Sequence, residues 1–429
     1  MARVGIGALL LVVLQACGAP SVAKQDAKDR TGTGGDEVDD RGSDRDTPSD
    51  DSEAPSSPAG SGAGCADGPL PTVDTTAIDP FFTQHMKTAN VPGAAVAVIG
   101  GGRIKWAKGY GYANVAEKKP VTTDTLFMLA SVSKAVTAVA LMQLVEDKSR
   151  GLALDQDIDA KLPFTVRSPR FPSTPITYRM LLTHTASLID SNTYWSIAMP
   201  TPLTQGDHPT PLLDFERSYV VRTDSWSQAR PGTAYSYSNT GAALIGLLVE
   251  RISGKNLQDY TKANVFDRLG MKESSWFLRG LDASHIAVPY DGAPLAPQGH
   301  YGYPDYPAGQ LRTSVTQLSR FLLAFAQKGK CGTRILEEAT VAEIGKPQIP
   351  SIEPSQGLIW YVDNKGGRSA LGHNGGDVGV STDMFFDPAT GNGYVLLTNG
   401  STNTSGSTTA QNAMKAMNDE LMRLSTTLP

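Results

Sequence analysis

The chain has 429 residues, of which 40% are hydrophobic and 19% charged, so it can form at least one globular core and is not a wholly disordered protein. The formal net charge is −5, and residues 18–64 alone contribute −6 through eleven acidic and five basic side chains. The rest of the chain is close to neutral and has no basic cluster. Nucleic acid is therefore not an expected partner.

Residues 1–16 have the pattern of a secretory signal. Arg3 is followed by an apolar run over residues 4–14 and then by small residues. This run is much shorter than the roughly 20 residues that a membrane-spanning helix requires, so a transmembrane anchor is the less favoured alternative. We therefore expect the protein to be exported.

The end of this signal resembles the lipobox of bacterial lipoproteins. Residues 14–17 read Leu-Gln-Ala-Cys, which implies cleavage before Cys17 and lipidation of that cysteine. Ordinary cleavage after Ala23 is the alternative. The lipobox predicts a membrane partner, held through the lipid at Cys17, and a protein that faces the periplasm or the cell surface.

Residues 17–69 are predicted to be a disordered acidic tether. From Gly18 to Gly64 there is no aromatic residue, Leu or Ile, and the segment is rich in Asp, Ser, Gly and Pro. Such a composition cannot bury enough apolar surface to offset the entropy lost on ordering. The folded domain is therefore predicted over residues 70–429.

The cysteines and histidines give no pattern of a metal site. The three cysteines, Cys17, Cys65 and Cys331, include no C-x-x-C pair, and the six histidines include no His-x-x-x-His pair. We expect chemistry without a metal or another cofactor. Cys65 and Cys331 can form a disulfide in an oxidising compartment or remain two free thiols.

The predicted domain has strands at both ends and helices between them. Residues 93–99 and 104–112 form β-type runs around a glycine turn, and residues 135–145 have the spacing of a buried helix. Further helices are predicted over 177–184, 240–252, 256–269, 314–328 and 408–425, and strands over 357–362, 369–372, 383–386 and 393–397. This order predicts an α/β (α+β) fold. One antiparallel sheet combines the N- and C-terminal segments, is flanked by helices and receives an inserted, mainly helical region.

The first chemical motif is Ser131-Val132-Ser133-Lys134, at the start of the predicted buried helix. Residues three apart lie on one helical face, so Ser131 Oγ and Lys134 Nζ can meet. A desolvated lysine can act as general base for a serine nucleophile. The motif alone is weak, because a serine at a helix start is often only an N-cap.

Two more motifs supply polar groups for the same chemistry. Tyr237 and Asn239 stand just before a predicted helix, where a hydroxyl can relay a proton and an amide can contact both lysine and substrate. His373-Asn374-Gly375-Gly376 lies on or beside a late strand. Glycines at a strand edge let substrate backbone approach, and the N–H of Gly376 can join that of Ser131 as an oxyanion hole.

Together and in this order, the three motifs resemble those of the serine β-lactamase and penicillin-binding protein superfamily. The resemblance covers roughly residues 75–425 and is closest to the branch with class C β-lactamases, D-Ala-D-Ala carboxypeptidases and related esterases. It also includes the segments 176–185, 231–240 and 308–311.

The resemblance assigns a role to each motif residue. Ser131 is the acylated nucleophile, Lys134 and Tyr237 share the base and acid roles, and Asn239 orients Lys134 and the substrate. His373 takes the place of a cation that faces a substrate carboxylate. Asn374, Gly375 and Gly376 line the substrate, and His184 is structural.

Two departures from the family pattern affect the expected activity. The third motif is His-Asn-Gly rather than Lys-Thr-Gly, and residues 185–188 replace the usual Ser-Gly-Leu turn. A histidine is only partly charged near neutral pH. We therefore expect a serine hydrolase that acts on a D-amino-acid peptide, as a carboxypeptidase does, or on a small ester. The alternatives are a true class C-like β-lactamase and a slow-turnover penicillin-binding or sensor module.

Overall fold

The computed structural model describes residues 70–402 and 406–429. The predicted signal at 1–16, the tether at 17–69 and the lipidation site Cys17 lie outside this range and remain predictions. Within the described part of the chain, no helix is both long and apolar enough to cross a membrane.

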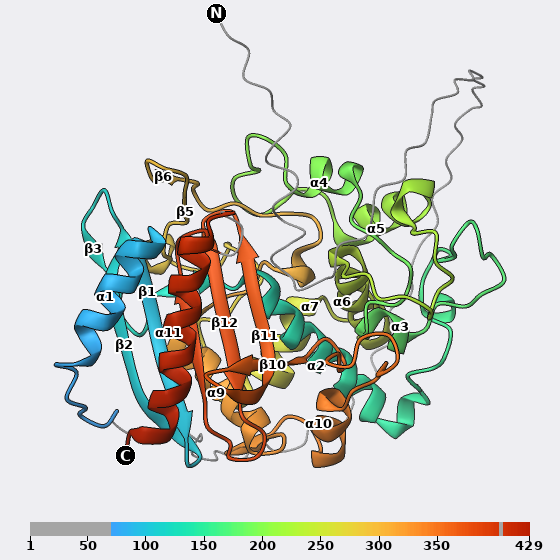
Figure 1. Cartoon of the computed structure of the whole chain (residues 1–429). Coiled ribbons are helices and arrows are strands. Elements are labelled where there is room, and N and C mark those ends of the chain that lie inside the picture. Colours follow the sequence, from blue (N-terminus) through green and yellow to red (C-terminus); the bar gives the residue numbers. More distant parts are fainter. Residues whose placement is uncertain (1–69, 403–405) are drawn as a thin grey trace, which may run out of the picture.

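A seven-stranded antiparallel sheet forms the centre of the molecule (Figure 1). The N-terminal hairpin pairs with the last strand, Ala94 opposite Thr398, so the two ends of the chain share one sheet as predicted. The strand order is β10-β11-β12-β13-β1-β2-β3. The strands are β1 (Gly93–Gly100), β2 (Arg103–Asn114), β3 (Lys119–Pro120), β10 (Tyr361–Lys365), β11 (Arg368–Asp377), β12 (Val380–Phe386) and β13 (Gly393–Thr398).

Helices cover both faces of this sheet. On one face, α1 (Ile78–Ala89) and α11 (Thr408–Thr427) pack together over the strands (Figure 1). On the other face lie α9 (Val315–Ala326) and α2 (Ser133–Glu146). Strand β1 shows why both faces must be covered. Its residues Ala94, Val96 and Val98 enter one apolar cluster and its alternate residues 95, 97 and 99 enter the other.

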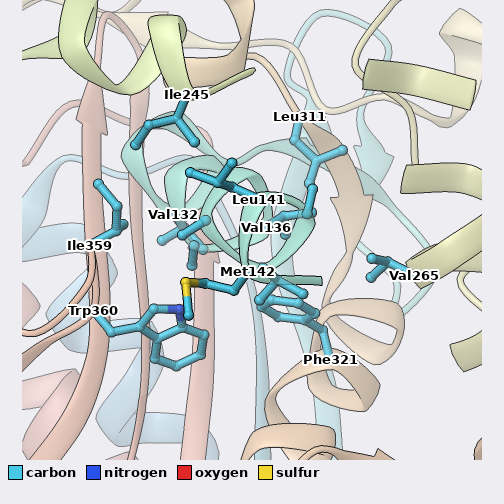
Figure 2. Packing of buried hydrophobic residues seen from close by; sticks show 14 of the residues in the cluster. Val132, Val136, Leu141, Met142, Ile245, Val265, Leu311, Phe321, Ile359 and Trp360 are labelled. Carbon is cyan, nitrogen blue, oxygen red and sulfur yellow. The ribbon is translucent and has the colours of Figure 1, made fainter. Parts of the chain in front are cut away.

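Helix α2 lies in the larger apolar core. Figure 2 shows Val132, Val136 and Met142 packed among side chains from the sheet side and from the helical region, including Trp360 and Ile245. The indole of Trp360 stacks on Phe325 at a centroid distance of 3.9 Å. Because α2 is buried nearly all round, a polar residue on it must find partners inside the protein.

The inserted region is mainly helical, as predicted. It contains α3 (Tyr178–Leu182), α4 (Asn192–Ala198), α5 (Leu212–Val220), α6 (Asn239–Ser253), α7 (Leu257–Thr261) and α8 (Asp267–Leu269). The helix predicted over 256–269 is divided, because a π-helical turn at Lys262–Phe266 separates α7 from α8. A two-stranded sheet of β4 (Leu126–Met128) and β7 (Arg312–Ser314) and helix α10 (Glu338–Gly345) complete the surroundings of α2.

Several elements differ from the sequence prediction. Helix α1 precedes the hairpin and was not predicted, and α4, α5 and α10 were not predicted either. The strand predicted over 357–362 begins only at Tyr361, because Leu358 N donates to Ile344 O (2.9 Å) and Ile359 N donates to Leu182 O (2.6 Å). These bonds tie the segment to the helical side instead of to a strand.

Cys331 is buried and disulfide-bonded. The sequence left open whether Cys331 forms a disulfide or is a free thiol, and the free thiol is therefore wrong. Cys65, the partner considered for it, lies outside the described residues.

Candidate active site

Ser131 and Lys134 meet at the start of α2. Ser131 lies in the short 3-10 turn Ala130–Val132, and Lys134 Nζ donates to Ser131 Oγ at 2.9 Å. The lysine side chain is completely buried, whereas Ser131 is half-buried and open to a substrate. Ala130 has a φ of +46°, a left-handed conformation that is unusual for alanine and that often marks a functional turn. The predicted contact between the two residues is thus present.

Lys134 is held by partners from three segments. Besides Ser131, its Nζ donates to Asn239 Oδ1 at 2.7 Å and to the carbonyl oxygen of Ala308 at 2.6 Å. An ammonium group has three donors, and these acceptors account for all of them. Asn239 is the first residue of α6, and Ala308 belongs to the segment 308–311 that the resemblance included. The predicted contact of Asn239 with Lys134 is present, and the Ala308 carbonyl is an additional partner.

Asp190 fixes the end of α6 that presents Asn239. Its carboxylate accepts from Asn239 N at 2.7 Å, from Thr240 N at 3.2 Å and from the hydroxyls of Thr240 and Ser238, both at 3.2 Å. Burial raises the pKa of Asp190, although the backbone bonds act in the opposite direction. Sequence reasoning missed this residue, because nothing in the local pattern links it to a helix almost fifty positions later.

We expect Asp190→Ala to lower the free energy of unfolding by about 3 kcal/mol, because four hydrogen bonds to the start of α6 are lost. Asp190→Asn keeps the oxygen that Thr240 and Ser238 contact and should lose about half as much. Urea denaturation of both variants measures the difference. Equal stability of the two variants would show that the contacts to Thr240 and Ser238, which only Asp190→Asn keeps, contribute nothing.

Tyr237 lies beside the lysine, between two histidines. Lys134 Nζ is 5.0 Å from the centre of the Tyr237 ring, and the rings of His184 and His373 lie 4.5 Å and 6.4 Å from that ring. His184 Nδ1 accepts from Ser238 N at 3.2 Å, which supports the turn that carries Tyr237. Burial and Lys134 lower the pKa of His184 well below its usual value. His184 thus supports the site as a neutral side chain, in agreement with the structural role expected for it.

Strand β11 forms the opposite wall of the site. A Cβ added at Gly375 would lie 2.5 Å from Leu129 O and 2.9 Å from Ser131 N, so only glycine lets the strand pack against the nucleophile turn. The last pair between β10 and β11 joins Tyr361 to Gly372, so residues 373–377 of β11 extend beyond the end of β10. Gly376 follows directly, and its joint role with Ser131 N as oxyanion hole stays a prediction.

The structure corrects the role expected for His373. Its side chain is buried, and desolvation and Lys134 lower its pKa from 6.5 to about 3. Its Nδ1 lies 2.5 Å from the carbonyl oxygen of Asn374. The imidazole is therefore neutral near pH 7 and is not a cation for a substrate carboxylate. The sequence could not reveal this, because it does not show that His373 and Lys134 share one buried pocket.

Asn374 also lies differently from the expectation. Side chains alternate along a strand, so Asn374 projects from the face opposite to His373 and Gly375. Its Oδ1 accepts from the Tyr361 hydroxyl at 2.9 Å. The structure thus brings together Ser131, Lys134, Tyr237, Asn239, His373 and Gly375, and it directs the Asn374 side chain elsewhere.

The low pKa of His373 has a consequence for stability. Between pH 6.5 and about 3 the unfolded chain binds a proton at His373 that the folded chain does not, so this term stabilises the fold at neutral pH and is lost as the pH falls. As the pH is lowered from 7 to about 4, the free energy of unfolding of His373→Asn should therefore fall less than that of the wild type. Urea denaturation across this range tests it, and parallel curves for the two proteins would contradict it.

No group of three or more histidine, cysteine or acidic side chains is placed to hold a metal ion in the described ranges. The groups around Ser131 are the Lys134 amine, the Tyr237 side chain and the Asn239 amide. The site as described consists of groups for proton transfer and acyl transfer.

The antiparallel sheet, the helical region inserted in it and the Ser131–Lys134 pair define the class of the β-lactamase/transpeptidase fold. The family model "Beta-lactamase" matches residues 78–417, so the chain belongs to this family. It also resembles the structure of a penicillin-binding protein homologue from Pyrococcus abyssi, with a TM-score of 0.67 and 26% identity over 80% of this chain and 77% of the other. The family and the fold expected from the sequence are thus confirmed.

Two curated relatives are similar in sequence. A D-aminopeptidase from Gluconobacter oxydans is 32% identical over 187 residues, which are 43% of this chain and 32% of the relative. Protein flp from Staphylococcus aureus is 23% identical over 332 residues, 75% of this chain and 62% of the relative. The chain thus matches less than two thirds of the length of these curated relatives.

Proposed function

We propose that the protein is a serine hydrolase that forms an acyl-enzyme on Ser131 and acts on D-amino-acid amides or peptides. The observation that carries this proposal is the 2.9 Å contact between Ser131 Oγ and a completely buried Lys134. Buried lysines need partners, and here the serine is one of the three. The similarity to a D-aminopeptidase supports the substrate class.

The geometry supports the following steps of acylation. Once the Lys134 ammonium has lost a proton, its neutral amine accepts the proton of Ser131 Oγ as this oxygen attacks the substrate carbonyl carbon. Asn239 and Ala308 hold Nζ in place by accepting its other hydrogen bonds. Tyr237, beside Nζ, relays the proton to the leaving amine as the amide bond breaks. A water molecule then attacks the carbonyl carbon of the ester, and its proton passes through the same groups to Ser131 Oγ as the ester bond breaks, which releases the acid and restores the serine.

The neutral His373 changes the balance between the candidate activities. Carboxypeptidases and β-lactamases act on substrates with a carboxylate, and a neutral imidazole offers that group no positive charge. This favours amide and peptide substrates that are recognised through a group other than a carboxylate. It argues against carboxypeptidase activity. A small ester remains compatible, since an ester needs no charged partner.

Intact-protein mass spectrometry tests the proposed function. The protein is incubated with D-alanine p-nitroanilide, with p-nitrophenyl acetate and with a penicillin, for short and long times, and the adduct is mapped. We expect hydrolysis of the first two compounds and an acyl adduct on Ser131 from the ester. Rapid consumption of the penicillin instead would indicate a β-lactamase, and a lasting penicillin adduct would indicate a slow-turnover penicillin-binding module.

For the N-terminal segment we propose export and lipid anchoring at Cys17. Residues 1–16 carry the signal pattern and the lipobox that support this proposal. Labelling of expressing cells with a lipid precursor tests it. Unlabelled protein that begins at Lys24 would show ordinary cleavage instead.

A further inference from the structure

The face of β11 that approaches Ser131 also carries a carboxyl group. Because side chains alternate along a strand, residues 373, 375 and 377 project from the same face. Gly375 packs against Ser131 N, and His373 lies on the Tyr237 side. Asp377 therefore lies beyond Gly375 in the other direction, about 7 Å along the strand. The nucleophile thus has a neutral imidazole on one side and an acidic side chain on the other.

Hydrogen bonds hold the Asp377 carboxylate in position. It accepts from Val378 N at 2.8 Å and from the Tyr303 hydroxyl. The Tyr301 hydroxyl, which donates to the carbonyl oxygen of Val378 at 2.8 Å, lies beside the carboxylate. Desolvation raises its pKa to about 6, and the charge of Lys134 acts against that rise. Asp377 is a half-buried residue, so part of its surface remains exposed.

Tyr303 links this carboxylate to the nucleophile turn. A Cβ added at Gly309 would collide with the Tyr303 hydroxyl and lie 3.5 Å from the carbonyl carbon of Ala130. The Tyr303 hydroxyl is therefore next to the residue that precedes Ser131. Through this hydroxyl, Asp377 is connected to the turn that carries Ser131.

The cations near Asp377 are committed to other groups. Arg312 is almost completely buried and donates to the carbonyl oxygens of Gln310 at 3.2 Å and Tyr301 at 2.6 Å. Lys134 donates to Ser131, Asn239 and Ala308. A substrate cation that reaches Asp377 would add a charge-assisted hydrogen bond to those that already orient this carboxylate.

We propose that Asp377 is a specificity-determining residue that binds the free α-ammonium group of the substrate. The inference rests on the proposed function and narrows it to D-amino-acid amides and peptides with a free N-terminus. In such substrates the ammonium group is bonded to the carbon next to the scissile carbonyl. One carboxylate beside the nucleophile can therefore select the amine and position that carbonyl.

The test compares three substrates at neutral pH: D-alanine p-nitroanilide, its N-acetyl derivative and p-nitrophenyl acetate. We expect the wild type to prefer the free amine over the acetylated compound. In Asp377→Asn the ratio of these two kcat/KM values should fall about 10- to 100-fold, because a charge-assisted hydrogen bond is lost. Asp377→Glu keeps the charge and should keep more of the preference than Asp377→Asn does.

The matched control is Asp363→Asn on the neighbouring strand β10, where the carboxylate pairs with Lys365 at 3.0 Å. This variant should keep the wild-type ratio. An unchanged ratio in Asp377→Asn, or an equal fall with all three substrates, would overturn the inference. A wild type that hydrolyses both D-alanyl compounds equally would also overturn it and leave the proposed function standing. A wild type that acts only on the ester would refute the proposed substrate class and the inference together.

Discussion

Ser131→Ala is expected to lower kcat/KM by at least about a thousandfold on every substrate, because the atom that forms the acyl bond is removed. The fold should survive, since the half-buried Ser131 side chain contributes about 1 kcal/mol through its bond to Lys134. Hydrolysis of p-nitrophenyl acetate gives the rate, and intact-protein mass spectrometry shows whether any adduct forms.

Ser133→Ala is the matched control for this change. Ser133 lies two residues later in the same motif, and its Oγ accepts from Leu311 N at 3.2 Å inside the core. Its loss should cost about 1 kcal/mol of stability and leave turnover within a few-fold of wild type. Hydrolysis at the wild-type rate by folded Ser131→Ala protein would remove Ser131 from the mechanism.

The fold could largely be predicted because its elements are strongly patterned. The glycine turn between β1 and β2 and the apolar spacing of α2 are local signals, and both elements form where they were expected. The prediction failed where distant contacts decide the conformation. Residues 357–360 have a strand-like composition, but the N–H groups of Leu358 and Ile359 bond to helix-side carbonyls, so the strand starts later.

The same distinction applies to the candidate site. The Ser131–Lys134 contact follows from a spacing of three residues, and family motifs pointed to Asn239 and Tyr237. The neutral state of His373 follows from burial next to a lysine 239 positions earlier, which no local pattern expresses. The position of Asp377 near the nucleophile likewise follows only from the fold, in which β11 packs against Ser131.

Lys134→Met is expected to slow acylation of Ser131 about a hundred- to ten-thousandfold, the usual range for loss of a general base. Methionine is unbranched and nearly fills the volume of the lysine side chain, so the buried helix α2 should still pack. The stopped-flow burst of p-nitrophenol from an ester measures acylation separately from later steps.

Lys365→Met separates catalysis from the general effect of removing a buried lysine. Lys365 is also largely buried, but its partners are Asp363 at 3.0 Å and Asp383 at 3.4 Å, away from Ser131. Removing it leaves Asp383 buried without its cation and should cost about 3 kcal/mol of stability, while the folded protein still acylates at the wild-type rate. If Lys134→Met also acylates at that rate, the proton of Ser131 must leave through another group, and Tyr237 is then the one in position.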